Sequence, residues 1–111
     1  MVKNYVPEKG DIVWLDFTLQ LGHEQRGRRP AIVLSKKTYN QKIGLAIFCP
    51  ITSKEKGYPF EVKITGKKIN GCVLSDQVKS LDWTERNIEY IETTSEEIME
   101  VVLQKFLVLI Q

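Results

Sequence analysis

Short apolar runs, most of them ended by a turn signal, account for most of the chain and predict a fold made mainly of β-strands. The clearest run, "DIVWLDF" at 11–17, is almost continuously apolar and follows a turn at Lys9 and Gly10. A strand without a polar face indicates burial on both sides of a sheet. Further runs of strand length lie at 29–35, 44–52 and 88–92, and the segment 72–83 is expected to form one or two further strands.

The segment at 60–65, "FEVKIT", shows strict alternation instead. Phe60, Val62 and Ile64 share one face of an extended chain, and the polar residues between them share the other. This pattern predicts a half-exposed strand. By contrast, "KKTYNQKI" at 36–43 is polar and is predicted to be a connection.

The C-terminal segment has helical periodicity. Apolar residues recur there at Ile98, Val101, Val102, Phe106 and Leu109. Thr94 followed by Glu97 is the pattern of a capping box, so we expect a helix from about 95 to 109. Its last turn, "FLVLI", is apolar nearly all round, which indicates a second surface such as a symmetric partner chain.

These elements predict a single domain over residues 1–111. Many short strands with one C-terminal α-helix are typical of a small, strongly twisted SH3-like β-barrel. A ferredoxin-like fold is the alternative, but it needs more than the one strong helix found here.

Several classes of protein are disfavoured by composition. No apolar run approaches the roughly 20 residues that span a bilayer, and the N-terminal segment lacks the apolar core of a signal peptide. One histidine and two cysteines cannot build a structural zinc site in one chain, and Cys49 and Cys72 lie in apolar segments as buried small residues do. We therefore expect a cytoplasmic protein that works without a metal or a cofactor.

The segment "HEQRGRRP" at 23–30 concentrates charge immediately before an apolar run. Residues 1–56 hold ten Lys and Arg against five Asp and Glu, so an anionic partner is plausible for this half of the chain. Two interpretations stand at this point. The segment is either a solvated loop that opens a strand or part of a site for a phosphate group.

The available side chains suit the cleavage of RNA, because RNA supplies its own nucleophile, the 2′-hydroxyl. Glutamate can accept the 2′-OH proton, the arginine fork can stabilise charge on phosphoryl oxygens, and hydroxyl groups can add donors. Segment 23–30 provides Glu24 and three arginines, and "PITSKEKG" at 50–57 provides Thr52 and Ser53. If the strands beside these segments are neighbours, their ends converge on one phosphate.

Three motifs occur in order and at suitable spacing: "GDIVW" at 10–14, "EQRGRRP" at 24–30 and "DQVKS" at 76–80. On these motifs the chain resembles the MazF/PemK family of mRNA interferase toxins from about residue 5 to residue 92. The resemblance implies a homodimeric endoribonuclease with an SH3-like barrel. Such enzymes cleave single-stranded RNA, including mRNA, at short sequences without metal and leave 2′,3′-cyclic phosphate and 5′-hydroxyl ends.

The resemblance also implies partners and residue roles. It implies a cognate antitoxin whose acidic, extended C-terminal tail occupies the RNA groove. Arg29, Thr52 and Glu24 are the implied catalytic residues, with Glu24 as the general base. The implied substrate-binding residues are Asp16, Phe17, Gln25, Arg28, Ser53, Asp76, Gln77 and Lys79. Of these, Gln25 and Arg28 are expected on a loop over the groove.

Two positions depart from the family pattern. Leu74 stands where plasmid-type relatives carry a catalytic arginine, which favours Arg29 with Thr52, and Arg28 stands where some relatives carry histidine. Two alternative functions fit the same fold class. One is a binding-only CcdB-like toxin that poisons DNA gyrase, and the other is a non-catalytic RNA-binding barrel.

Overall fold

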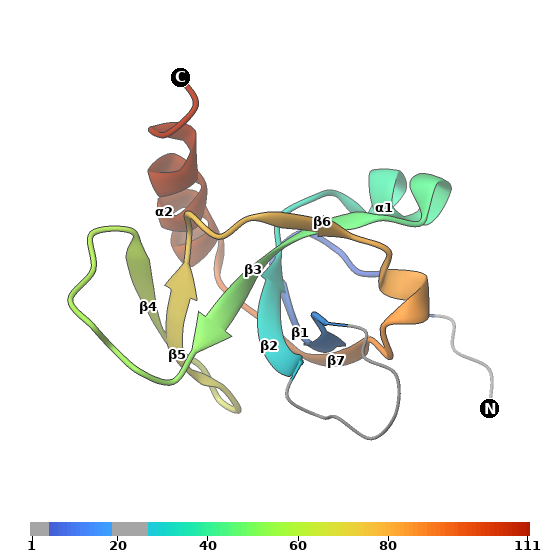
Figure 1. Ribbon diagram of the computed structural model, residues 1–111, viewed down its shortest axis with the longest axis horizontal. Helices are drawn as coiled ribbons and strands as arrows, with labels where there is room; N and C mark the ends of the chain where they lie inside the picture. The colour runs from blue at the N-terminus through green and yellow to red at the C-terminus, as the bar shows by residue number, and fades with distance from the viewer. Residues whose placement is uncertain (1–4, 19–26) are drawn as a thin grey trace.

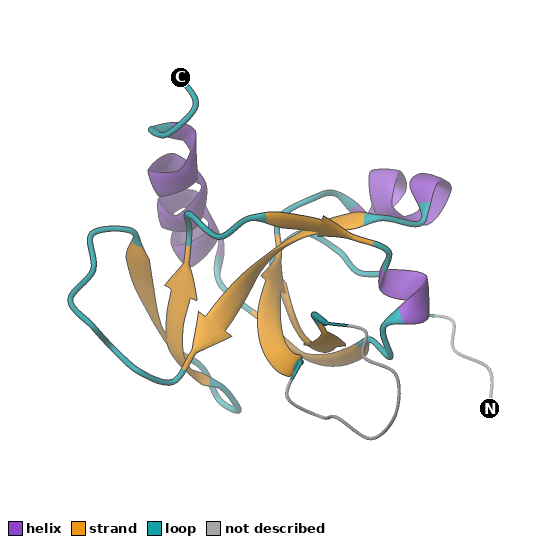
Figure 2. Cartoon of the chain, in the orientation of Figure 1, coloured by secondary structure: helices purple, strands orange, loops and turns teal. Residues whose placement is uncertain are grey.

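One antiparallel sheet, curled on itself, carries the fold, and the C-terminal helix packs beside the strand at one of its edges (Figure 1). The computed structural model describes residues 5–18 and 27–111. Within them the strands are β1 (Asp11–Asp16), β2 (Arg28–Val33), β3 (Ala46–Thr52), β4 (Glu61–Thr65), β5 (Asn70–Leu74), β6 (Lys79–Leu81) and β7 (Glu89–Thr93). The helices are α1 (Lys37–Ile43), the 3₁₀ turn η1 (Trp83–Glu85) and α2 (Glu96–Leu107) (Figure 2).

The strand order is β4-β5-β3-β2-β1-β7, and β6 pairs with β3 beside β5. The mainly β, barrel-like fold with a C-terminal helix is therefore confirmed. Ile12 of β1 packs in one cluster of buried side chains, and Val13 and Leu15 pack in another. This division explains the continuous apolar run, because both faces of β1 are covered as the sequence predicts. Val62 and Ile64 of β4 are buried, whereas the alternating residues Glu61, Lys63 and Thr65 are half-buried or exposed. The predicted alternation is therefore confirmed as well.

The prediction of a simple connection at 36–43 is wrong, because residues Lys37–Ile43 form α1. This short helix is held by a buried polar group instead of an apolar stripe. The Asn40 side chain donates to the carbonyls of Pro7 at 2.8 Å and Ser35 at 3.1 Å and accepts from the Ser35 hydroxyl. Gly44 then ends the helix in the left-handed region, at φ 81°.

Helix α2 begins one residue later than predicted. Its N-cap is Ser95, whose hydroxyl accepts from the Ile98 N–H, and not Thr94 with the capping-box partner Glu97. The Thr94 N–H instead donates to the Gly10 carbonyl at 2.9 Å, which ties this residue to the turn before β1. Beyond the end of α2, the apolar Val108, Leu109 and Ile110 are 46–68% exposed.

Candidate functional site

Strand β3 extends beyond the end of its pairing with β2, and a notch opens in the sheet at this edge of β3. Its first part pairs with β2, ending at the pair Ala31–Pro50. Its last two residues, Ile51 and Thr52, pair with β5. Pro30, the next residue of β2, has no N–H to donate to β3, so the β2–β3 ladder stops there.

The notch beyond this point is a cavity of about 380 Å³. It is lined by Trp14, Arg29, Pro30, Ile51, Thr52, Ser53, Ile69 and Asn70. Continuing the β2–β3 register by two residues places Arg29 opposite Thr52. Two predicted catalytic residues and the predicted binding residue Ser53 therefore line one cavity.

The exposure of these residues suits contact with a large substrate. Arg29 and Ser53 are exposed and Thr52 is half-buried. Among the described residues, no carboxylate lies within ion-pair distance of the Arg29 guanidinium. The notch thus offers a cation and two hydroxyl side chains on adjoining strands, which is a donor set for a phosphate group.

Arg28 is placed differently from its prediction. It lies in β2, not on a loop, and its guanidinium contacts Asp16 and Glu89, each at 3.1 Å. It also donates to the Asn87 carbonyl at 2.9 Å. Two carboxylates therefore surround Arg28, in contrast to its neighbour Arg29.

Asp16 and Phe17 do not line the notch within the described part of the chain. Asp16 contacts Arg28, and Phe17 is half-buried against the cluster that contains Leu15. Arg86 donates to the carbonyls of both residues, at 3.1 and 2.8 Å, and fixes the chain as it leaves β1.

The predicted base-reading residues lie in another part of the chain. Lys79 pairs with Phe48, four residues along β3 from Thr52, which corresponds to about 13 Å of strand. The Asp76 carboxylate accepts a hydrogen bond from the Tyr58 hydroxyl, and this bond raises the pKa of Tyr58. The Gln77 N–H closes a turn on the Leu74 carbonyl at 3.0 Å. A single chain therefore does not bring Asp76, Gln77 and Lys79 into the notch.

The remaining two predicted residues, the general-base candidate Glu24 and Gln25, lie outside the described residues.

One wall of the notch was missed from the sequence. Ile69 comes from the turn between β4 and β5, Asn70 is the first residue of β5, and Glu92 of β7 holds the turn. Its carboxylate accepts N–H groups from Lys67, Lys68 and Ile69 at 3.0, 2.9 and 2.9 Å. These bonds, led by that of Lys68, lower the pKa of Glu92. The approach is close, because a Cβ added to Gly66 would lie 2.5 Å from Glu92 Oε2.

Trp14 also lines the notch. It is half-buried and packs against the buried cluster that contains Ile12. Its position opposite Pro30 in the β1–β2 ladder carries it there. Only the register between strands shows this, because the apolar run itself is read equally well as core.

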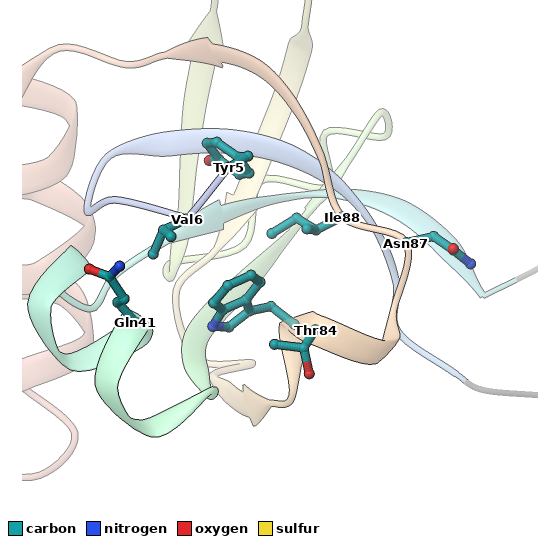
Figure 3. A pocket seen from close by; sticks show the side chains of 7 residues that line it. Tyr5, Val6, Gln41, Thr84, Asn87 and Ile88 are labelled. Carbon is teal, nitrogen blue, oxygen red and sulfur yellow. The ribbon is translucent and has the colours of Figure 1, made fainter. Parts of the chain in front are cut away.

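A larger cavity of about 560 Å³ lies between the N-terminal segment, α1 and η1 (Figure 3). Tyr5 and Trp83 form two of its walls, and each is held by its own hydrogen bond, to Asp11 at 2.5 Å and to the Asn40 carbonyl at 3.1 Å. It contains none of the predicted catalytic residues, and these bonds anchor the N-terminal segment and α1.

The described residues contain no group of three or more His, Cys, Asp or Glu side chains that could hold a metal ion. Cys49 and Cys72 are buried thiols that are not paired with each other, as predicted, and burial raises the pKa of Cys49 to about 12. In the part of the chain that the structure describes, no helix has the length and apolar character needed to cross a membrane.

Comparisons with known proteins place the chain among toxins of one family. Residues 8–110 match a family described as the PemK-like, MazF-like toxin of type II toxin-antitoxin systems. The chain is 44% identical over 110 residues to the endoribonuclease toxin MazF of Escherichia coli K12, with 99% of each chain covered. It is 35% identical over 109 residues to the endoribonuclease toxin ChpB of the same strain, with 93% of each covered.

Solved structures give the same result. A crystal structure of MazF from Deinococcus radiodurans matches with a TM-score of 0.86 and 47% identity, covering 96% of this chain and 97% of that one. A MazE-MazF crystal structure from the same organism matches with a TM-score of 0.84 and 42% identity, covering 96% of each chain.

Proposed function

Because the chain belongs to the family of PemK-like, MazF-like toxins of type II toxin-antitoxin systems, we propose that it is an endoribonuclease toxin that uses the notch between β2 and β3 to cleave single-stranded RNA. One observation carries the assignment of the site. Arg29 and Thr52 come from different strands and line a single exposed cavity. The identity of 44% to a relative named an endoribonuclease toxin supports the reaction class.

The proposed reaction needs no covalent enzyme intermediate. The 2′-hydroxyl oxygen attacks the adjacent phosphorus, and the bond to the 5′ oxygen of the next nucleotide breaks. Glu24 accepts the 2′-OH proton, and a proton is delivered to the departing 5′ oxygen. The products are a 2′,3′-cyclic phosphate and a 5′-hydroxyl. No step of this scheme calls for a metal ion or a cofactor.

Arg29 and the hydroxyl groups act on the phosphate itself. Negative charge grows on the phosphoryl oxygens as the 2′ oxygen attacks, and donors already fixed around them stabilise this charge. The Arg29 guanidinium presents a planar fork of N–H groups to two oxygens. Thr52 and Ser53, on the opposite side of the notch, add hydroxyl donors.

Five further predicted residues bind substrate around this centre. We propose that Phe17 and Gln25 hold nucleotides near the notch. Asp76, Gln77 and Lys79 read bases and hold the backbone farther along the RNA strand, and the contacts to bases give sequence specificity. In this proposal Lys79 makes a phosphate contact, and such contacts contribute affinity without sequence preference.

Two protein partners belong to the proposal. A second copy of the chain would cover the apolar Val108, Leu109 and Ile110 in a homodimer. A cognate antitoxin with an acidic, extended C-terminal tail would compete with RNA for the basic residues around the notch, and the similarity to a toxin crystallised as a MazE-MazF complex supports such a partner. Because the substrate is cellular RNA, the proposal places the protein in the cytoplasm.

One assay separates this function from the alternatives. Purified protein is incubated with a long RNA in EDTA, and the fragment ends are mapped, with the Arg29→Ala variant purified in parallel as a control for contaminating nucleases. Discrete cuts that end in cyclic phosphate, absent from the control, support the proposal. Intact RNA with folded wild-type protein would contradict it. In that case, retained RNA binding would favour a non-catalytic barrel and inhibition of gyrase would favour a CcdB-like toxin.

A further inference from the structure

The Arg28 guanidinium makes three hydrogen bonds to other parts of the fold. Nη1 donates to Asp16 Oδ1 at 3.1 Å and to the Asn87 carbonyl at 2.9 Å, and Nη2 donates to Glu89 Oε1 at 3.1 Å. Asn87 in turn donates from Nδ2 to Asp16 Oδ2 at 2.8 Å. One guanidinium thus joins β1, the turn before β7, and β7 itself to the first residue of β2.

The charges of this cluster argue against a direct role in holding RNA. Arg28 contributes one positive charge, and Asp16 and Glu89 contribute two negative charges. A phosphate group approaching the cluster would meet a net negative charge and would have to displace a carboxylate that already holds the guanidinium. Arg28 is therefore a poor phosphate contact in this arrangement.

The neighbouring residue, Arg29, needs a support of this kind. On one side its backbone pairs with Leu15 of β1. On the other side the β2–β3 ladder has already ended at Ala31–Pro50, so the sheet holds Arg29 from one side only. The β1–β2 ladder ends one residue later, at the pair Asp16–Arg28.

We infer that Arg28 is a positioning residue for Arg29. By tying the start of β2 to β1 and β7, it holds the Arg29 backbone where the sheet ladders stop, and so fixes the guanidinium that acts on the phosphate. This inference rests on the proposed function, in which Arg29 is catalytic. It assigns Asp16, Asn87 and Glu89 to the support of the site and not to RNA contact.

Two arginine variants separate positioning from phosphate binding. Lysine keeps the charge but has no planar fork to span three acceptors. We expect Arg28→Lys and Arg28→Ala both to lower the single-turnover cleavage rate at least tenfold, while the Kd for RNA and its salt dependence stay close to the wild type. A phosphate contact would behave differently. Arg28→Lys would then retain activity, and Arg28→Ala would reduce the slope of log K against log salt by about 0.7.

Replacing the carboxylate of Glu89 gives a second test, because a pure charge effect and a positioning role predict different changes in the cleavage rate and in RNA affinity. Glu89 is an exposed residue whose replacement is not expected to prevent folding. If Glu89 acted only through its charge, Glu89→Gln would tighten RNA binding and leave or raise the rate. Positioning instead predicts a slower cleavage step at unchanged affinity. Glu85→Gln, an exposed carboxylate outside the cluster, is the matched control and is expected to cleave as the wild type does.

The outcomes distinguish this inference from the proposed function. If the wild type does not cleave RNA, the proposed function fails. If the wild type cleaves, the inference is overturned by an Arg28→Lys or Glu89→Gln variant with an unchanged cleavage rate, or by an Arg28→Ala variant whose loss of activity comes from weaker, less salt-dependent binding.

Discussion

Replacing Glu92 with glutamine should loosen the turn that forms one wall of the notch. The carboxylate accepts three consecutive backbone N–H groups from residues 67–69. A hydrogen bond to a charged group contributes roughly 1.5–3 kcal/mol when it is well formed and shielded. Glu92 is only half-buried, and a glutamine oxygen can still accept part of this set, so we expect a loss of about 1–2 kcal/mol in the free energy of unfolding.

Urea unfolding at pH 7 and thermal unfolding measure this loss. For a domain of this size, 1–2 kcal/mol corresponds to a Tm lower by roughly 5–10 °C. The control is Glu55→Gln, whose carboxylate meets Lys63 at 3.7 Å with both side chains exposed. Such a pair contributes about 0–0.5 kcal/mol, so the control should unfold nearly as the wild type does.

The stabilisation by Glu92 is expected to depend on pH. The backbone hydrogen bonds that its carboxylate accepts, led by that of Lys68, lower the pKa of Glu92 in the folded state. The stabilisation is therefore complete above the unfolded carboxyl pKa of about 4.3 and is lost as the pH falls through the folded value. The difference between the wild type and Glu92→Gln should narrow from pH 7 to pH 3. A difference no larger than that of Glu55→Gln, or one that is constant over this range, would mean that the Glu92 carboxylate does not stabilise the turn.

Further predictions concern the helix cap, the thiols and the RNA groove. Ser95→Ala should cost about 1 kcal/mol of stability in urea unfolding, whereas Thr94→Ala should cost less than about 0.5 kcal/mol, and the reverse order would restore Thr94 as the N-cap. Cys49 and Cys72 are buried with raised pKa values, so iodoacetamide should label both only after unfolding, and rapid labelling of the native protein at pH 8 would contradict this. Lys79→Ala should weaken RNA binding for all sequences and reduce the salt slope by about 0.7, and an unchanged slope would place Lys79 away from the backbone.

The strands could be predicted from the sequence because the burial of their side chains follows from local patterns of apolar residues. The run at 11–17 is apolar because β1 is covered on both faces, and Val62 and Ile64 alternate because β4 is covered on one. Helix α1 was missed for the opposite reason. Its buried residue is Asn40, whose stabilising contacts reach Pro7 and Ser35, and no periodic apolar pattern marks it.

The site could be predicted only in part. Arg29 and Thr52 are identified from their chemistry and from the family resemblance, but the notch between them depends on where the pairing of β2 with β3 ends, which no local pattern shows. Glu92 holds the turn at 67–69 through hydrogen bonds between residues more than 20 positions apart, and no local sequence pattern shows these bonds. The sequence also does not show the role of Arg28. It predicts a cation on a loop, whereas the structure pairs Arg28 with the distant Glu89.

In the proposed function, Arg29 in the notch stabilises the transition state of RNA cleavage. The most direct measurement compares single-turnover cleavage and RNA affinity for the wild type, Arg29→Ala and the charge-matched control Lys42→Ala, an exposed residue of α1. We predict that Arg29→Ala cleaves about 10²–10³-fold more slowly, equivalent to roughly 3–4 kcal/mol, with a Kd within a few-fold of the control. Cleavage by Arg29→Ala at the rate of Lys42→Ala would contradict the account.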